Sequence, residues 1–189
     1  TIAENSGGLR GLKYGITKNY VQGLEVVLAN GDIIHTGGKN VKDVSGYDMT
    51  KLFTGSEGTL GIVTKALLKL VPAPEATKSM IAIFDSLDDA GKAVSGIIAA
   101  KIIPATLEIL DNATIRTVED FMHVGLPVDA DAILLIEVDG NPVVVEDEKT
   151  KVLAVLKENH AREVTLAKSP EHKAQLWTAR RMALPCLAK

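Results

Sequence analysis

The chain has 189 residues, of which 46% are hydrophobic and 24% charged, a composition typical of a globular protein rather than a disordered or fibrous one. Its 21 basic and 24 acidic residues give a net charge of −3, which disfavours nucleic acid as a partner because nucleic-acid-binding domains carry a basic face. The single cysteine, Cys186, excludes an internal disulfide framework and favours a cytoplasmic location, and no apolar run approaches the ~18–20 residues of a transmembrane helix.

Glycine and proline divide the sequence into two parts. Twelve of the sixteen glycines lie within the first 61 residues, whereas the prolines begin at Pro72. We therefore expect a domain boundary near Pro72, with domains at 1–74 and 75–189. The sequence opens at Thr1 within a glycine-rich motif, and we expect it to be a piece of a longer protein.

The first part predicts a small β-rich region. Asn30-Gly31 lies between two apolar runs and is the dipeptide of a type I′ turn, which predicts a hairpin. Asp48 is suited to cap a short helix, and Pro72 cannot donate to a sheet ladder, so it ends the last strand. The expected elements are strands at 24–29 and 32–36, a helix through Phe53, a turn at 55–58 and a strand at 60–70.

From residue 79 onward, strands and helices alternate. Ser86, Asp111, Asn141 and Ser169 are expected helix N-caps, and prolines follow two of them at the first helical position. The run 131–138 is almost continuously apolar and so predicts a central strand. The expected elements are strands at 79–84, 106–110, 131–138 and 162–167, and helices at 86–101, from 112, at 142–159 and from 170 to before Pro185. This order predicts an α+β fold with a ferredoxin-like, split-βαβ antiparallel sheet.

Several binding signatures are missing from the sequence. It contains no G-x-G-x-x-G fingerprint, and the Gly-Lys pairs at 38–39 and 91–92 lack the Ser or Thr of a Walker A loop. Cys186 is expected to be a small buried hydrophobe. The histidines are isolated in sequence, so we expect no metal site: they are His35, His123, His160 and His172.

Two glycine-rich segments are the positive signal. In 5–15, glycines that accept positive φ could turn backbone N–H groups toward a diphosphate, although composition alone favours a simple glycine-rich turn. In 55–63, glycines spaced around Glu57 indicate either backbone held against a ligand or a tight turn with bulges.

Taken together, the segments TIAENSGGLRGLKYG, YVQGLEVVLANGDIIHTGG and SGYDMTKLFTGSEGTLGIVTKALLKLVPAP closely resemble the FAD-linked oxidases. This is the fold family of vanillyl-alcohol oxidase and p-cresol methylhydroxylase, and among its members the sequence looks similar to the glycolate oxidase flavin subunit and D-lactate dehydrogenase. The resemblance continues more loosely to LWTARRMALP at 176–185. It implies that 1–74 is the C-terminal part of a PCMH-type FAD-binding domain and that 75–189 is the N-terminal part of a ferredoxin-like cap, or substrate, domain.

The resemblance also implies which residues contact ligands. Arg180 matches an arginine that binds the substrate carboxylate, with Arg181 as the alternative if the register shifts by one. The guanidinium group suits this role because its planar fork matches a carboxylate. The cofactor is FAD, and the matched positions are Ala3, Asn5, Ser6, Gly7, Gly8, Tyr14, Gly15, Val21, Glu57, Gly58 and Ile62.

The implied activity is FAD-dependent oxidation of a D-2-hydroxy acid, glycolate or D-lactate, by hydride transfer to the flavin. A quinone, an electron-transfer flavoprotein or an iron–sulfur subunit would accept the electrons. The family's first pyrophosphate loop and its histidine-bearing segment have no match in this sequence, so the resemblance assigns no catalytic base. Two alternatives remain, namely an enzyme similar to alkyl-dihydroxyacetone-phosphate synthase and an inert cap-domain fragment without activity.

Overall fold

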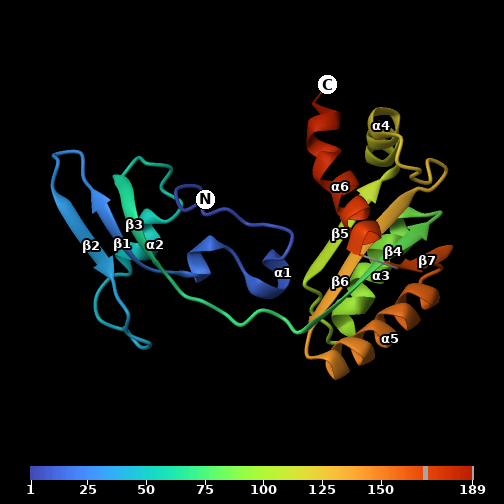
Figure 1. Cartoon of the computed structure of the whole chain (residues 1–189), viewed down its shortest axis with the longest axis horizontal. Helices are drawn as coiled ribbons and strands as arrows, with labels where there is room; N and C mark the ends of the chain where they lie inside the picture. The colour runs from blue at the N-terminus through green and yellow to red at the C-terminus, as the bar shows by residue number, and fades with distance from the viewer. Residues whose placement is uncertain (168–169, 189) are drawn as a thin grey trace. The chain divides into compact units, whose positions relative to one another are not determined.

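The structure is a computed structural model that describes residues 1–167 and 170–188. The chain folds into two compact units, Thr1–Ala73 and Pro74–Lys189. Each unit has its own antiparallel sheet (Figure 1). Each also has its own hydrophobic core.

The first unit is a three-stranded antiparallel sheet in the order β2-β1-β3. Its core is small and consists of buried residues from β1 and α2: Val21, Leu24, Val26 and Phe53. The elements are α1 (Gly11–Tyr14), a 3-10 turn η1 (Thr17–Asn19), β1 (Val21–Val27), β2 (Ile33–Gly37), α2 (Met49–Phe53) and β3 (Ile62–Leu68).

The predicted hairpin is present, but the prediction of a type I′ turn is wrong. A type I′ turn needs positive φ at both Asn30 and Gly31, whereas only Gly31 has it, at φ 90°. The N–H of Leu28 donates to the carbonyl oxygen of Asp32 over 2.8 Å, so residues 29–31 form the loop. Gly31 therefore supplies the one left-handed residue of a longer hairpin loop, and Asn30 keeps an ordinary conformation.

The predicted cap of the short helix α2 is confirmed. The Asp48 side chain accepts a hydrogen bond from the N–H of Lys51 over 3.0 Å. The hydroxyl groups of Thr36 on β2 and Thr50 on α2 lie 2.8 Å apart and join the helix to the strand. These contacts fix the two ends of the connection 38–48, whose residues are largely exposed.

The second unit contains a four-stranded antiparallel sheet in the order β5-β6-β4-β7. With the strands numbered along the chain, this is the ferredoxin-like order, so that prediction is confirmed. The elements are β4 (Ala76–Phe84), α3 (Leu87–Ala99), β5 (Thr106–Asp111), α4 (Asn112–Met122), β6 (Ala132–Gly140), α5 (Pro142–Glu158), β7 (Glu163–Leu166) and α6 (Pro170–Leu187).

Helices α3 and α5 lie side by side and cover one face of this sheet (Figure 1). Because side chains alternate along a strand, the even-numbered residues of β4 and β6 fill the core against these helices. Those residues are Met80, Ala82, Phe84, Ala132, Leu134, Ile136 and Val138. The odd-numbered residues of these two strands consequently lie on the opposite face of the sheet. Arg180 of α6 contacts β5 on that face.

The predicted helix starts agree with the structure where it describes them. The side chains of Ser86, Asp111 and Asn141 accept hydrogen bonds from the N–H groups of Asp89, Thr114 and Val143. The fourth predicted cap, Ser169, lies outside the described residues.

The expectation that the last helix ends before Pro185 is wrong, because α6 continues to Leu187 with Pro185 inside it. Inside a helix a proline removes one N–H from the ladder and its ring crowds the carbonyl group four residues earlier, yet the N–H of Ala188 still donates to Leu184 over 3.1 Å. Burial of Cys186 against Val118 of α4 favours this continuation.

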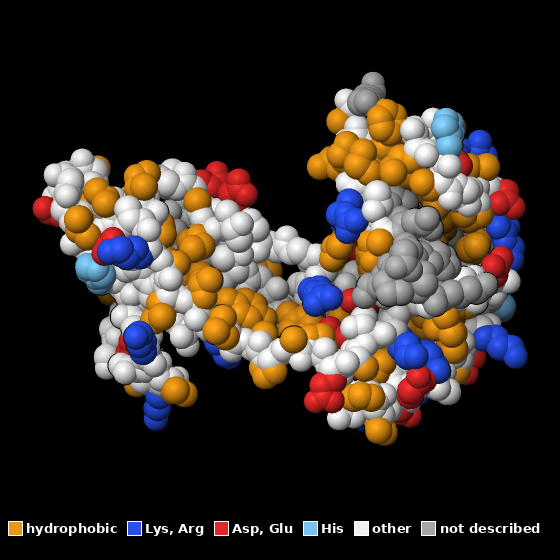
Figure 2. All heavy atoms as spheres, viewed as in Figure 1, with side chains coloured by type: hydrophobic (Ala, Val, Ile, Leu, Met, Phe, Trp, Pro, Cys, Tyr) orange, Lys and Arg blue, Asp and Glu red, His pale blue; other side chains and the backbone are white. Residues whose placement is uncertain are grey.

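Hydrophobic side chains remain exposed around α4 and the end of α6 (Figure 2). Within the described ranges, no helix combines the length and apolar character needed to cross a membrane.

Candidate functional site

The two glycine-rich segments lie next to each other in the first unit. The carbonyl oxygen of Ile2 accepts a hydrogen bond from the N–H of Gly55 over 3.0 Å, and that of Ala3 accepts one from Glu57 over 2.8 Å. The turn at 55–58 is thereby joined to the start of the chain. The structure thus brings together Ala3, Asn5, Glu57 and Gly58, which were matched to cofactor positions.

Asn5 shapes the N-terminal loop. It has φ 52°, in the left-handed region, and its side-chain oxygen accepts a hydrogen bond from the N–H of Lys18 over 2.8 Å. The neighbouring carbonyl oxygen of Ser6 accepts hydrogen bonds from both the N–H and the hydroxyl of Thr17, over 3.2 and 2.8 Å. Asn5 and Ser6 therefore act by holding the loop against η1.

Glycines 7, 8 and 58 provide the part of this region that fits a diphosphate. No described residue accepts a hydrogen bond from their N–H groups. A Cβ added at Gly8 or Gly58 would meet no atom within 4 Å, and Gly58 has φ 76°. Exposed backbone donors with open space beside them suit the phosphate oxygens of a dinucleotide, so these residues fit the FAD that the sequence implies.

The residues at the other matched positions make contacts within the protein itself. The carbonyl oxygen of Tyr14 accepts a hydrogen bond from the hydroxyl of Tyr20 over 2.6 Å. A Cβ at Gly15 would lie 2.5 Å from the side-chain oxygen of Asn19. In the sheet, Val21 pairs with Leu68, whereas Ile62 pairs with Val27 at the opposite end of β1.

The separation of Val21 and Ile62 matters for the site. Six residues along a strand span about 20 Å, and Val21 is buried whereas Ile62 is 62% exposed. These two positions therefore do not share one compact patch. Any ligand that contacts both must extend along the sheet.

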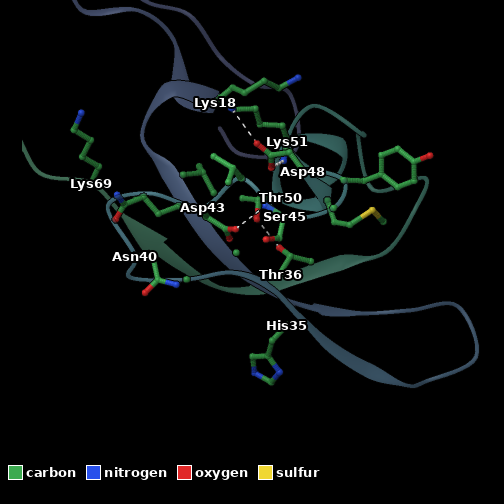
Figure 3. Close-up of a pocket in the computed structure, with 18 of the residues that line it drawn as sticks. Lys18, His35, Thr36, Asn40, Asp43, Ser45, Asp48, Thr50, Lys51 and Lys69 are labelled. Carbon is green, nitrogen blue, oxygen red and sulfur yellow. Dashed lines mark hydrogen bonds and ion pairs between the residues drawn. The ribbon is translucent and has the colours of Figure 1, made fainter.

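Sequence reasoning missed a cavity of about 590 Å³ beside the connection 38–48 (Figure 3). Three lysines line it, namely Lys18, Lys51 and Lys69, together with Asp43 and Asp48. Hydrogen bonds from the N–H and side chain of Lys51 hold the pKa of the Asp48 carboxyl below its usual value. Val21 is the sole matched cofactor position among the residues lining the cavity.

The exposed face of the first sheet carries a charged cluster around Glu25. Its carboxylate accepts hydrogen bonds from Lys65 at 2.9 Å and Thr64 at 2.8 Å, and His35 lies 3.1 Å away. The ammonium group of Lys65 is the main cause that lowers the pKa of Glu25 to about 2. Nothing in these contacts extends toward the glycine-rich loops.

In the ranges 1–167 and 170–188, no group of three His, Cys, Asp or Glu side chains is arranged to hold a metal ion.

In the second unit, Arg180 contacts the sheet. Its Nε and Nη2 atoms donate to the same oxygen, Oε2 of Glu108 on β5, over 2.9 and 2.7 Å. Arg181, the alternative position, donates instead to the hydroxyl of Thr178 on its own helix and is exposed. Of the two arginines, Arg180 is the one that the fold directs to the sheet.

Glu108 was missed because its partner is distant in sequence. The signal available was a glutamate within a strand, because glutamate is depleted in strands. Other polar groups lie on the same face: Thr106 pairs with Glu137, and Glu137 pairs with Ser79, in a row across β5, β6 and β4. The Ser79 hydroxyl donates to Glu137 over 2.8 Å, and all three residues are buried.

Comparison with known proteins gives relatives along the whole chain. The family described as "FAD linked oxidases, C-terminal domain" matches residues 73–189. The "Glycolate oxidase subunit GlcD" of Bacillus subtilis (strain 168) is 58% identical over 188 residues, which cover 100% of this chain and 40% of that protein. A D-lactate dehydrogenase of Anaerostipes hadrus is 34% identical over 186 residues, which cover 95% of this chain and 39% of that protein. The chain therefore spans roughly two fifths of the length of these curated relatives.

A solved structure of an alkyldihydroxyacetonephosphate synthase matches 98% of this chain and 37% of its own chain, with a TM-score of 0.75. The sequence identity is 23%, so this likeness shows the fold alone. The mixed fold with two antiparallel sheets agrees with the fold class predicted from the sequence.

Proposed function

Because this chain belongs to the FAD-linked oxidase family, we propose that the protein oxidises a small D-2-hydroxy acid, glycolate or D-lactate, with FAD as cofactor. The observation that carries the proposal is the 58% identity, along the whole chain, to a protein named as a glycolate oxidase subunit. The match to a D-lactate dehydrogenase supports the same substrate class. The likeness to alkyldihydroxyacetonephosphate synthase is one of fold and does not favour that second activity.

When bound, FAD would supply the hydride-accepting chemistry of the reaction. The backbone N–H groups of Gly7, Gly8 and Gly58 would hold its phosphates, because they are exposed and lack a partner among the described residues. Asn5 and Glu57 shape the loops that carry these groups, through their left-handed conformations and the hydrogen bonds described above. Ser6, Tyr14 and Gly15 would contribute indirectly, because their contacts within the fold hold the same loops in place.

Arg180 binds the carboxylate of the hydroxy acid. Its guanidinium presents paired N–H donors that match the two carboxylate oxygens, and it remains 38% exposed after pairing with Glu108. Fixing the carboxylate fixes the direction of the adjacent α-carbon and its hydroxyl group.

The proposal includes partners for the reaction. The Bacillus relative is named as a subunit, which supports a multi-subunit assembly. We propose that the electrons leave to another protein or to a quinone. An electron-transfer flavoprotein or an iron–sulfur subunit would serve the same purpose. The single cysteine supports a reducing, cytoplasmic location.

The test is steady-state kinetics on the full-length protein with a soluble dye as electron acceptor. Glycolate, D-lactate and L-lactate are compared at equal concentrations, and bound flavin is released by denaturation and quantified. We expect close to one FAD per chain and turnover of glycolate or D-lactate well above that of L-lactate. A flavin-loaded protein that oxidises neither acid contradicts the proposed substrate class, and a purified protein without FAD contradicts the proposed cofactor.

A further inference from the structure

Glu108 and Arg180 form an ion pair between a strand and a helix of the second unit. One carboxylate oxygen of Glu108, Oε2, accepts hydrogen bonds from both Nε and Nη2 of Arg180. Strand β5 is paired with β6 along its length, with Glu108 opposite Leu135, so the backbone of Glu108 is fixed by the sheet. The side chain of Glu108 is 24% exposed and that of Arg180 is 38% exposed.

This contact uses only one edge of the guanidinium group. An arginine has five N–H bonds, and Glu108 accepts from Nε and from one hydrogen of Nη2. The neighbouring edge, formed by Nη1 and the second hydrogen of Nη2, presents another pair of parallel donors. Such a pair can bind a second carboxylate bidentately while the first remains in place.

From this geometry, and resting on the proposed function, we infer that Glu108 is a positioning residue for substrate binding. It holds the Nε–Nη2 edge of Arg180, so that the Nη1–Nη2 edge is presented to the carboxylate of the hydroxy acid. An unpaired arginine would lose its rotamer freedom only when substrate binds, and that entropic cost weakens binding. Because Glu108 already orders Arg180 in the folded protein, this entropy is lost during folding and not during substrate binding.

Glu108 also changes the charge that the substrate meets. Its carboxylate compensates the guanidinium charge, so the substrate anion is recognised by the paired donors more than by net charge. The polar row of Ser79, Glu137 and Thr106 lies on the same sheet face, because Thr106 and Glu108 are two residues apart on β5. This face is mixed, because the polar row lies on one side of Glu108 while Leu135, directly opposite Glu108, and Leu110 are buried hydrophobic residues.

The test uses the full-length protein and the probe 2-hydroxyisobutyrate, which keeps the carboxylate and hydroxyl but has no α-hydrogen to transfer. Its dissociation constant is measured by calorimetry for wild type, Glu108→Ala, Glu108→Asp, Glu108→Gln and Arg180→Ala. Glu158→Ala serves as the control, since Glu158 is exposed at the end of α5. Thermal melts and flavin content are recorded for every variant.

We expect the dissociation constant to rise roughly three- to tenfold in Glu108→Ala, because Arg180 must then be ordered by the ligand itself. Glu108→Asp should behave similarly, since its shorter side chain does not reach the guanidinium. Glu108→Gln keeps an acceptor oxygen and should bind within about twofold of wild type. Rescue by glutamine separates positioning from a loss of the fold, and turnover of glycolate or D-lactate should follow the same order.

Wild-type affinity in Glu108→Ala or Glu108→Asp, with binding lost in Arg180→Ala, overturns the role of Glu108 and leaves the proposed function in place. Wild-type affinity in Arg180→Ala overturns the carboxylate contact and, with it, the role of Glu108. A wild-type protein that neither binds the probe nor oxidises the two acids contradicts the proposed function itself. The case in which Glu108→Ala fails to fold is covered by the comparison of Glu108→Asp with Glu108→Gln.

Discussion

Gly37 lies so close to Gln22 that no side chain fits between the two strands at this point. A Cβ on Gly37 would come within 2.0 Å of the carbonyl oxygen of Gln22 and within 2.6 Å of the hydroxyl oxygen of Thr50. Gly37 also has φ 64°, in the region that side chains other than glycine rarely adopt. It ends β2 and begins the connection 38–48 that borders the cavity of the first unit.

We therefore expect Gly37→Ala to destabilise the first unit. Left-handed strain alone costs about 1–3 kcal/mol, and relief of the overlap with backbone must separate β1 from β2. Gly38→Ala is the matched control, because its Cβ would meet no atom within 4 Å and its φ is not positive. Denaturant unfolding of both variants measures the difference, and equal stabilities would contradict the close approach described here.

The carboxylate of Glu119 predicts a dependence of stability on pH. It accepts hydrogen bonds from the N–H groups of Leu126, Gly125 and Val124 at 2.8, 3.0 and 3.2 Å, and so shapes the loop that follows α4. These bonds, that from Leu126 first, lower the pKa of Glu119 from its usual value. A carboxyl whose pKa is lower in the folded state stabilises the fold above its unfolded pKa of about 4.3. That contribution is lost as the pH falls through the lowered pKa.

Glu119→Gln should accordingly unfold at a lower denaturant concentration than wild type at pH 7, because the amide offers a neutral acceptor to three donors. The difference should shrink as the pH falls below the unfolded pKa of about 4.3 and then through the lowered pKa of the folded state, because the wild-type carboxyl becomes protonated. Glu158→Gln, at an exposed position, gives the baseline. A difference between wild type and Glu119→Gln that is the same at pH 7 and pH 3 would show that the charge of Glu119 does not stabilise the loop.

Local signals in the sequence predicted most of the fold. The caps at Ser86, Asp111 and Asn141 act on residues two or three positions away, so their effect is readable from the sequence itself. The strand order followed because the alternation of strands and helices restricts the connections that a sheet can make. The error at Pro185 arose where distant packing decides the structure, because the helix continues to Cys186 and its contact with Val118. The error at Asn30-Gly31 was local, because the dipeptide does not by itself set the length of the hairpin loop.

The candidate site was less accessible to sequence reasoning for the same reason. The hydrogen bond between Glu57 and Ala3 joins segments far apart in sequence, and no local sequence pattern predicts it. Family resemblance supplied both segments, whereas their hydrogen bonds required the structure. Glu108 is a clearer case, since it becomes a candidate only when α6 brings Arg180 to β5.

The last prediction distinguishes the two adjacent arginines of α6 in the full-length protein. Arg180→Lys should raise KM for glycolate or D-lactate and lower kcat while leaving flavin content unchanged. Lysine keeps the charge but loses the planar fork, so it can hold neither Glu108 nor a carboxylate through paired bonds. A shift of the reacting carbon by about 1 Å can lower the rate on the order of a hundredfold.

Arg181→Lys is the matched control, because Arg181 is exposed and contacts Thr178 of its own helix. We expect its kinetics to match wild type, since lysine at this position leaves the contact between Glu108 and Arg180 untouched. Steady-state kinetics of the two variants, with flavin content measured in parallel, decide between the two positions. Should Arg181→Lys impair the reaction while Arg180→Lys does not, the carboxylate contact belongs to the neighbouring position. If neither changes KM or kcat, α6 serves the fold alone and the substrate carboxylate is bound by other residues.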